Sequence, residues 1–272
     1  MIVLLLEFQL NFRHQIKHPK PKMEAYVRRT DLKDGITEIE FFHPQHNALP
    51  GVLLSELAEA IHSCGKEDQV EVIILKSGGD RTFCAGASFD ELVQIDHLEA
   101  GTVFFSGFAN VINACRKCPK LIIGRVQGKA VGGGVGLAAA VDYCLATDHA
   151  AIRLSEITIG IGPFVIGPAV ERKIGLAAFS QLSINATEFQ SAQWAKEKGL
   201  YAEVYADAEQ LDQGVMKIAA SLAATSPEAR AALKKMFWEG CEHWDSLLAE
   251  RATMSGQLVL SEFTKKALNK HR

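Results

Sequence analysis

The feature that most constrains this chain is a glycine-rich segment over residues 128–136, which reads Gly-Lys-Ala-Val-Gly-Gly-Gly-Val-Gly. Residues 121–126 before it are apolar and predict a buried strand, and residues 137–141 after it predict a buried helix. Inside an ordinary helix each of the three consecutive glycines would cost about 1 kcal/mol relative to alanine. At a strand-to-helix junction they indicate a tight turn that a ligand can approach closely, because no Cβ atom stands in the way.

The amides at the start of such a helix have no intrahelical acceptor, so they can bind an oxyanion. Considered alone, the segment is explained equally well by tight strand–helix packing without a ligand. A second junction of the same kind lies upstream, where residues 83–88 read Phe-Cys-Ala-Gly-Ala-Ser. They join a predicted strand over 70–75 to a predicted helix near 89–95.

Strands and helices alternate along the first two thirds of the chain with short connections, which predicts an α/β fold with parallel strands. Helical patterns dominate from about residue 166 onward, and residues 211–222 and 244–269 are the clearest. The further segments predicted before that point are strands at 35–42, 142–147 and 151–154 and helices at 53–61, 102–115 and 133–141.

The composition is that of a soluble globular protein, with 272 residues, 48% of them hydrophobic, and a net charge of −3. No basic stripe interleaved with aromatic residues indicates a nucleic-acid partner. The apolar residues 1–6 are too short for a membrane span, and no small-residue cleavage site follows them. We therefore expect residues 1–22 to be an extension outside the fold, followed by a core over 23–210 and a helical region over 211–272.

Six cysteines are present, and Cys115 and Cys118 form the only Cys-x-x-Cys pair. A structural zinc site needs a second pair or histidines at matching spacing, and the sequence has neither, so we predict no metal site. The simplest interpretation is a reduced, cytoplasmic protein.

Three motifs, in this order, make residues 24–270 resemble the crotonase superfamily of enoyl-CoA hydratases and isomerases. The first is Asn-Ala-Leu at 47–49, which opens a helix. The second is Arg-Thr-Phe-Cys-Ala-Gly-Ala-Ser at 81–88. The third is the glycine-rich segment, followed by Asp142 and by Leu-Ser-Glu at 154–156. The resemblance implies a spiral of repeated ββα units with a C-terminal helical region that forms homotrimers or dimers of trimers.

The resemblance also implies chemistry on acyl-CoA thioesters. The amides of Ala87 and Gly133 would form an oxyanion hole around the thioester oxygen, which becomes negative in an enolate. Glu156 would be the catalytic acid/base, although from the sequence alone a solvated carboxylate near a Ser155 cap is the commoner role for a glutamate. Asp142 is expected to be structural. No metal or redox cofactor is implied, because coenzyme A arrives with the substrate.

The resemblance further implies a set of substrate-binding residues. For His46, a solvated loop position remains an equal alternative. Lys265 and Lys266 resemble a terminal lysine that contacts CoA phosphates, and a solvated helix face explains them equally well. The expected substrate-binding residues are His46, Ala48, Ala85, Gly86, Ser88, Phe89, Val131, Gly132, Gly136 and Ser155.

Two departures bear on the reaction. Gly136 stands where familiar hydratases carry a second glutamate, and Asp90 stands where many members carry a lysine near the nucleotide. A single glutamate is shared with the Δ3,Δ2-enoyl-CoA isomerases, whereas residues 154–168 resemble methylglutaconyl-CoA hydratase-like proteins of leucine and isoprenoid catabolism. We weigh the second resemblance higher, so the expected activity is hydration of a branched enoyl-CoA. The alternatives are an isomerase and a non-catalytic acyl-CoA-binding protein.

Overall fold

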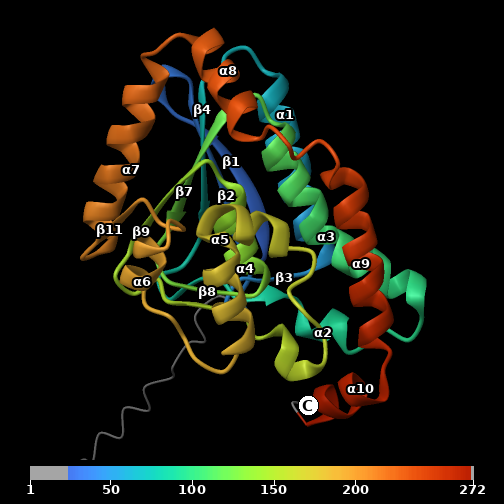
Figure 1. Ribbon diagram of the computed structural model, residues 1–272. Coiled ribbons are helices and arrows are strands. Elements are labelled where there is room, and N and C mark those ends of the chain that lie inside the picture. Colours follow the sequence, from blue (N-terminus) through green and yellow to red (C-terminus); the bar gives the residue numbers. More distant parts are fainter. Residues whose placement is uncertain (1–23, 271–272) are drawn as a thin grey trace, which may run out of the picture.

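The computed structural model describes residues 24–270 and contains one main sheet of six strands in the order β1-β2-β4-β7-β9-β11 (Figure 1). β1 and β2 are antiparallel, and the remaining neighbours in this sheet are parallel. The predicted parallel α/β fold is therefore confirmed. The strands are β1 (Tyr26–Asp31), β2 (Ile36–Phe42), β4 (Val72–Ser77), β7 (Leu121–Val126), β9 (Tyr143–Thr147) and β11 (Glu203–Tyr205).

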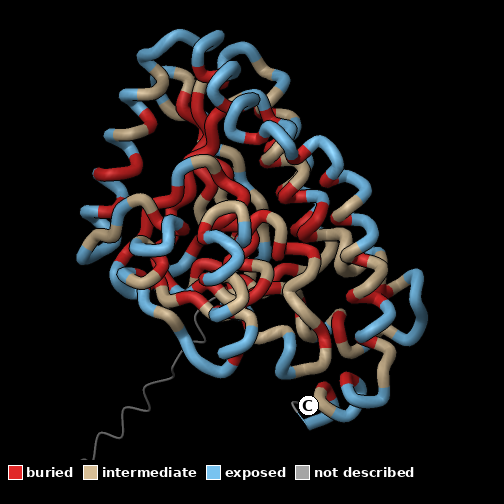
Figure 2. The backbone as a smooth tube through the Cα atoms, in the orientation of Figure 1, coloured by how far each residue is buried: buried red, intermediate tan, exposed pale blue. Residues whose placement is uncertain are grey.

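The central strands are apolar throughout because both faces of the sheet are covered. On one face Val72 and Ile74 pack against Leu211 and Val215 of α7 (Ala208–Ala223). On the other face their alternate neighbours, such as Ile73, join the large core beneath α1 (Gly51–Lys66) and α3 (Leu98–Lys117). Figure 1 shows α7 on the left of the sheet and α1 and α3 on the right, and Figure 2 shows the buried residues concentrated between them.

Short strands lie beside the main sheet, and four of them, β3, β5, β8 and β10, each follow a strand of the main sheet in the chain. β5 (Thr82–Cys84), β8 (Lys129–Val131) and β10 (Ile152–Arg153) make one small sheet, and β3 (Ala48–Leu49) pairs with β6 (Gly86–Ala87). The sequence β7-β8-α4, with α4 at Gly133–Ala140, is one complete ββα unit. The order β2-β3-α1 is another, so the predicted ββα unit is repeated along the chain.

Helices occupy the C-terminal part of the described chain. α9 (Trp244–Val259) packs closely against the backbone of α3, since a Cβ atom at Gly101 would lie only 2.8 Å from the Cα atom of Gly256. The remaining helices are α2 (Phe89–Leu92), α5 (Gly167–Ile184), α6 (Ala192–Glu197), α8 (Pro227–Phe237), α9 (Trp244–Val259) and α10 (Glu262–Asn269), with 3-10 turns η1 (Lys33–Gly35) and η2 (Glu156–Ile159).

The proposed division at residue 210 falls inside α7, which covers the main sheet as part of the core. The predicted extension over residues 1–22 lies outside the described residues. None of the helices within residues 24–270 is long and apolar enough to cross a membrane.

Asp142 connects α8 to the main sheet through hydrogen bonds. This is a structural role, as predicted. Its carboxylate accepts hydrogen bonds from Lys234 Nζ at 2.6 Å, Trp238 Nε1 at 3.1 Å and the Ile122 amide at 2.8 Å. The side chains of Asp142 and Lys234 are only 4% and 3% exposed. This buried charge is therefore paired and hydrogen-bonded, as a stable buried charge must be.

Candidate active site

The two small-residue junctions meet at the edge of one cavity. In the β3–β6 pair the amide of Ser88 donates to Leu49 O at 3.0 Å. Amides of successive residues in a strand point in opposite directions, so the amide of Ala87 points away from β3. Gly133 is the first residue of α4, and its amide lies 3.6 Å from the place where a Cβ atom at Gly86 would stand. The two predicted oxyanion-hole amides are therefore neighbours.

The cavity beside these amides has a volume of about 310 Å³ and is mostly apolar. Among residues 24–270, its lining carries polar groups on three side chains, those of Ser155, Glu156 and Ser255. The Ser255 hydroxyl already donates to Arg251 O at 3.0 Å. The other lining residues are Ala48, Ala85, Gly86, Ala87, Phe89, Leu92, Phe104, Phe105, Phe108, Val131, Gly132, Gly133, Ile159, Ile161, Gly162, Pro163, Phe164, Val165 and Ile166.

Glu156 is the one ionisable side chain in this described lining, and it begins the turn η2. Its Oε2 atom is buried and has no hydrogen-bond partner within the part of the chain that the structure describes. Burial raises the pKa of Glu156 to about 7, although backbone amides and the charge of Arg153 act in the opposite direction. A carboxyl group with this pKa exchanges protons readily near neutral pH, as a general acid/base requires.

Gly132 makes room for this carboxyl group. A Cβ atom at Gly132 would lie 2.9 Å from Glu156 Oε1, and the residue has a φ of 53°, which disfavours larger side chains. The glycine-rich turn therefore admits the Glu156 carboxyl group, and the same turn places Gly133 in the cavity wall.

Position 136, where the resemblance expects a second glutamate in hydratases, is closed by an apolar side chain. Gly136 is buried in α4, and a Cβ atom there would lie 2.5 Å from Ile166 Cγ2. Ile166 itself lines the cavity. The space for a second carboxylate is thus filled by isoleucine.

Most of the predicted site residues come together around this cavity, and three do not. His46 is exposed on its loop, Ser88 is buried with its hydroxyl accepting from the Glu91 amide at 3.3 Å, and Gly136 lies beneath Ile166. The residues brought together are Ala48, Ala85, Gly86, Ala87, Phe89, Val131, Gly132, Gly133, Ser155 and Glu156.

Asn47, the first residue of the Asn-Ala-Leu motif, holds its loop in place. Its side-chain amide donates to Gly78 O and Thr82 O, both at 2.9 Å, and its Oδ1 atom accepts from the His43 amide at 2.8 Å. Asn47 has a φ of 56°, a left-handed conformation that asparagine tolerates better than most residues. The motif therefore sets the position of Ala48 in the cavity wall.

The sequence did not indicate several residues of the wall. Phe104, Phe105 and Phe108 of α3 line the cavity, and the sequence predicts the helix over 102–115 without showing what it covers. Ser255 of α9 reaches the cavity from far along the chain, and no local signal marks it. No group of three or more His, Cys, Asp or Glu side chains suited to a metal ion occurs between residues 24 and 270.

Comparison with known proteins identifies the family. The model of the family described as enoyl-CoA hydratase/isomerase matches residues 31–270, so the chain belongs to this family. The mouse protein named enoyl-CoA hydratase domain-containing protein 2, mitochondrial, is 32% identical over 207 residues, which are 75% of this chain and 69% of the mouse protein. The resemblance to the crotonase superfamily is thus confirmed, and the chain is an enzyme of the hydratase/isomerase class.

Other relatives include both hydratases and an isomerase by name. A probable enoyl-CoA hydratase of Bacillus subtilis is 27% identical and covers 86% of this chain and 90% of its own. A peroxisomal Delta(3,5)-Delta(2,4)-dienoyl-CoA isomerase of Arabidopsis thaliana is also 27% identical, over 76% of this chain and 80% of the Arabidopsis protein. The crystal structure of an enoyl-CoA hydratase from Bacillus halodurans matches with a TM-score of 0.82, covering 90% of this chain and 99% of that one at 21% identity. This last likeness confirms the crotonase fold.

Proposed function

We propose that this enzyme moves a carbon–carbon double bond in an enoyl-CoA thioester, as a Δ3,Δ2-enoyl-CoA isomerase. The observation that carries the proposal is that Glu156 is the one ionisable side chain in the described cavity lining. Ile166 fills the space beside Gly136, where a second carboxylate would have to stand. Isomerisation needs one group that removes a proton and returns it, whereas hydration also needs a water held for attack.

The proposed reaction follows from the placement of the groups. The ionised Glu156 removes a proton from the α-carbon of a 3-enoyl thioester, and the electron pair of the broken C–H bond forms a dienolate. The amides of Ala87 and Gly133 donate to the thioester oxygen, where negative charge collects. Glu156 then delivers the proton to the γ-carbon, and the double bond is left between the α- and β-carbons. Coenzyme A enters and leaves with the acyl group, so the reaction requires no further cofactor.

Hydration is the second candidate, and it has two supports. Relatives from Bacillus subtilis and Rhodobacter capsulatus are named probable enoyl-CoA hydratases, and residues 154–168 resemble the methylglutaconyl-CoA hydratase-like group. In this cavity Ser155 is the remaining side chain whose hydroxyl is available to position a water, because Ser255 donates to its own helix. The count of polar groups therefore favours isomerisation.

We further propose that the protein is cytoplasmic and assembles as a homotrimer or a dimer of trimers. Exposed apolar side chains on α5 support assembly, since Ile184 is 79% and Leu176 62% exposed in a single chain. All six cysteines are free and buried, which suits a reducing compartment. Light scattering on the purified protein tests the assembly.

The experiment that tests the function supplies the purified enzyme with a 3-enoyl-CoA and, separately, a 2-enoyl-CoA of equal chain length. We expect the 3-enoyl thioester to be converted to its 2-enoyl isomer, and an α-deuterated 3-enoyl thioester to give a product that carries deuterium at the γ-carbon. Mass spectrometry distinguishes this product from a hydrate, which is heavier by one water. Rapid hydration of the 2-enoyl thioester without isomerisation of the 3-enoyl thioester would overturn the proposal.

A further inference from the structure

Cys84 lies behind the wall of the candidate active site. It is the last residue of β5 and is fully buried. The described cavity lining includes Ala85, Gly86 and Ala87, which follow directly, but not Cys84 itself. The proposed isomerisation assigns no role to this thiol, although Cys84 contacts both of the small-residue junctions.

The Cys84 thiol contacts both polar backbone atoms of Gly86. The Gly86 amide donates to Cys84 Sγ at 3.4 Å, and Sγ lies 3.9 Å from Gly86 O, within reach of a weak S–H hydrogen bond. Serine and threonine hydroxyls form the same kind of turn when they bond to the backbone two residues later. The peptide unit that carries Gly86 O also carries the amide of Ala87, and this unit is planar. The thiol therefore helps to fix the direction of the Ala87 N–H.

Gly86 needs this support because its backbone is unusually free. It has a φ of 95°, and a Cβ atom there would lie 3.2 Å from Val131 O. Glycine adopts many conformations at little cost, so the peptide between Gly86 and Ala87 can rotate unless it is held. Such a rotation would turn the Ala87 amide away from the cavity. The hydrogen bond to the thiol opposes it.

The backbone of Cys84 supports the second junction. α4 begins at Gly133, and a Cβ atom at Gly134 would overlap Cys84 O and lie 2.9 Å from Cys84 Cβ. The first turn of α4, which carries the Gly133 amide, therefore packs directly on Cys84. One residue thus contacts the segments that carry both oxyanion-hole amides.

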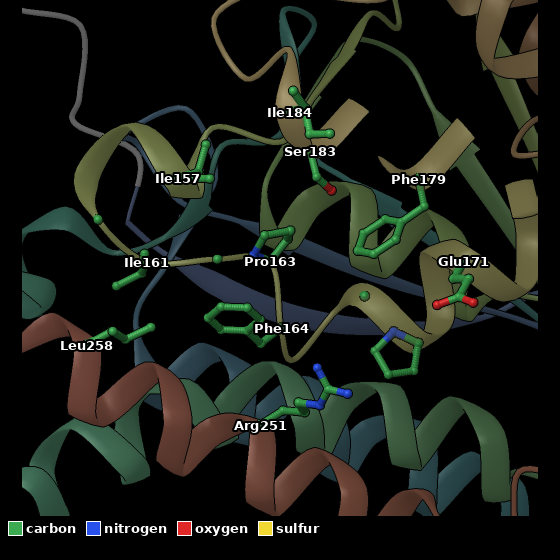
Figure 3. Close-up of a pocket in the computed structure, with 14 residues that line it drawn as sticks. Ile157, Ile161, Pro163, Phe164, Glu171, Phe179, Ser183, Ile184, Arg251 and Leu258 are labelled. Atoms are coloured by element: carbon green, nitrogen blue, oxygen red, sulfur yellow. The ribbon is translucent and has the colours of Figure 1, made fainter. Parts of the chain in front are cut away.

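Another wall of the active-site cavity has much less support behind it. Residues 161–164 separate this cavity from a second one of about 520 Å³, which Phe164 also lines and into which Arg251 extends (Figure 3). Open space on both sides allows that wall to adjust to a ligand. The wall that carries the amides is instead backed by the packed side chain of Cys84, so this wall keeps the donors in place.

A neutral side chain suits this position. Burial raises the pKa of the Cys84 thiol to about 12, and the hydrogen bond from the Gly86 amide opposes this only in part. The thiol therefore carries no negative charge near neutral pH that would repel an enolate. It also packs as a small apolar side chain, as buried cysteines generally do.

We propose that Cys84 is a positioning residue of the oxyanion hole, which aligns the amides of Ala87 and Gly133 on the thioester oxygen. The inference rests on the proposed function, in which these amides stabilise the dienolate. Donors of this kind act by being preorganised where negative charge develops in the transition state. Loss of the alignment should therefore slow turnover more than it weakens substrate binding.

The test compares Cys84→Ala, Cys84→Val and Cys84→Ser. Alanine and valine both remove the acceptor, the first by leaving a small cavity and the second by filling it, whereas serine supplies a hydroxyl. With 3-enoyl-CoA we expect kcat to fall by about 10- to 100-fold for alanine and valine, less than the about 10²- to 10³-fold typical for loss of a whole donor. Serine should retain most of the rate. Calorimetry with a saturated acyl-CoA should show Kd changes of less than about threefold.

Infrared difference spectroscopy tests the alignment itself. Hydrogen bonds to the thioester oxygen lower the carbonyl stretching frequency, which a ¹³C label at the thioester carbon identifies in a bound saturated acyl-CoA. We expect this shift in the unmodified enzyme and in Cys84→Ser, and only part of it in Cys84→Ala and Cys84→Val. Cys144→Ala is the matched control, because Cys144 is also buried but its Sγ lies beside Gly124 of β7. It should leave kcat and the shift unchanged.

A purely structural role for Cys84 predicts the opposite order, because a buried hydroxyl is costly in an apolar core and valine fills the space. The inference is therefore overturned if Cys84→Ser loses more activity than Cys84→Val. It is also overturned if kcat falls while the bound thioester keeps its full carbonyl shift, or if kcat matches that of Cys144→Ala in every variant. Either acceptor-free variant suffices if the other does not fold. An unmodified enzyme that binds the thioester without any shift would instead contradict the oxyanion hole of the proposed function.

Discussion

Two carboxyl groups of this chain, those of Asp142 and Glu156, are both buried but differ in their hydrogen-bond partners. Asp142 accepts hydrogen bonds from Lys234, Trp238 and the backbone, and its ion pair is almost inaccessible to solvent. Glu156 lies against an apolar cavity with its Oε2 atom unpartnered among the described residues, and its pKa is raised to about 7. Asp142 therefore has an ion-pair partner, whereas the buried Oε2 atom of Glu156 has no hydrogen-bond partner among the described residues.

The difference separates a group that stabilises the fold from one that is available for chemistry. A paired carboxylate such as Asp142 resists substitution, because its partners would be left buried and unpaired. An unpaired carboxyl group destabilises the fold in its charged form, yet it exchanges a proton near neutral pH. We therefore expect substitutions at position 142 to affect stability and substitutions at position 156 to affect turnover.

The largest effect is expected for Glu156→Gln in turnover. Glutamine keeps the shape of glutamate but cannot accept the α-proton, so kcat should fall by about 10²- to 10⁴-fold or more. Binding of a saturated acyl-CoA should change little, because the amides of Ala87 and Gly133 remain. In the unmodified enzyme kcat/KM should rise with pH through about 7, as Glu156 ionises.

Glu59→Gln on the exposed face of α1 is the control for this comparison and should turn over substrate normally. Steady-state kinetics with 3-enoyl-CoA and calorimetry with the saturated thioester make the two measurements. A Glu156→Gln enzyme that works at the unmodified rate would show that Glu156 is not the base.

The next largest effect is expected for Asp142→Ala in stability. The substitution leaves the Lys234 ammonium buried without its partner and should lower the free energy of unfolding by about 3–5 kcal/mol. Urea denaturation followed by circular dichroism measures the loss. Asp142→Ala combined with Lys234→Met should recover part of it, because no buried charge is then left unpaired.

Asp68→Ala, at an exposed turn, is the matched control and should stay within about 0.5 kcal/mol of the unmodified protein. If Asp142→Ala unfolds at the same urea concentration as this control, the hydrogen bonds to Lys234 and Trp238 are not what fastens α8 to the sheet.

The sequence predicted those features of the two carboxyl sites that depend on residues close together in the chain. Glycines at the strand-to-helix junctions identified the turns that carry Ala87 and Gly133, and the ordered motifs identified Glu156. Two partners of Asp142, Lys234 on α8 and Trp238 directly after it, lie 92 and 96 residues away, and no short-range pattern connects them to Asp142. Ile166 likewise fills the space at Gly136 from the start of α5, and Ser255 reaches the cavity from α9. Contacts of this kind depend on how the helices pack, so the sequence alone does not determine them.

A smaller effect of opposite sign is expected for Glu156→Gln in stability. The pKa of Glu156 is raised in the folded state from an ordinary 4.5 to about 7, so the fold favours the protonated form. The unmodified protein therefore loses stability as pH rises from about 4.5 to about 7, and glutamine should stabilise it by about 2–3 kcal/mol above that range. Urea denaturation at about pH 8 should show the full difference, and below about pH 4.5 it should vanish.

A stabilisation of equal size across the whole pH range would contradict this explanation, because it would have to come from packing instead of ionisation. Asp142→Asn provides the contrast at the same two pH values. It removes the charge from a carboxylate that has partners, so we expect it to destabilise the protein at about pH 8, where Glu156→Gln stabilises it.

The smallest effect concerns Gly136, whose contact with Ile166 leaves Glu156 as the single described ionisable group in the cavity. Gly136→Ala should raise the helix propensity of α4, but its Cβ atom would lie 2.5 Å from Ile166 Cγ2 and 2.7 Å from Ile166 Cβ. Overpacking of this kind costs about 1–3 kcal/mol, so we expect a net loss of stability. In an Ile166→Gly background both the Cγ2 and the Cβ atom are gone, and the same substitution should be better tolerated by about 1 kcal/mol in a double-mutant cycle. Urea denaturation of the four proteins gives the coupling. Additive losses would mean that Ile166 does not close position 136, and the argument against a second carboxylate there would fail.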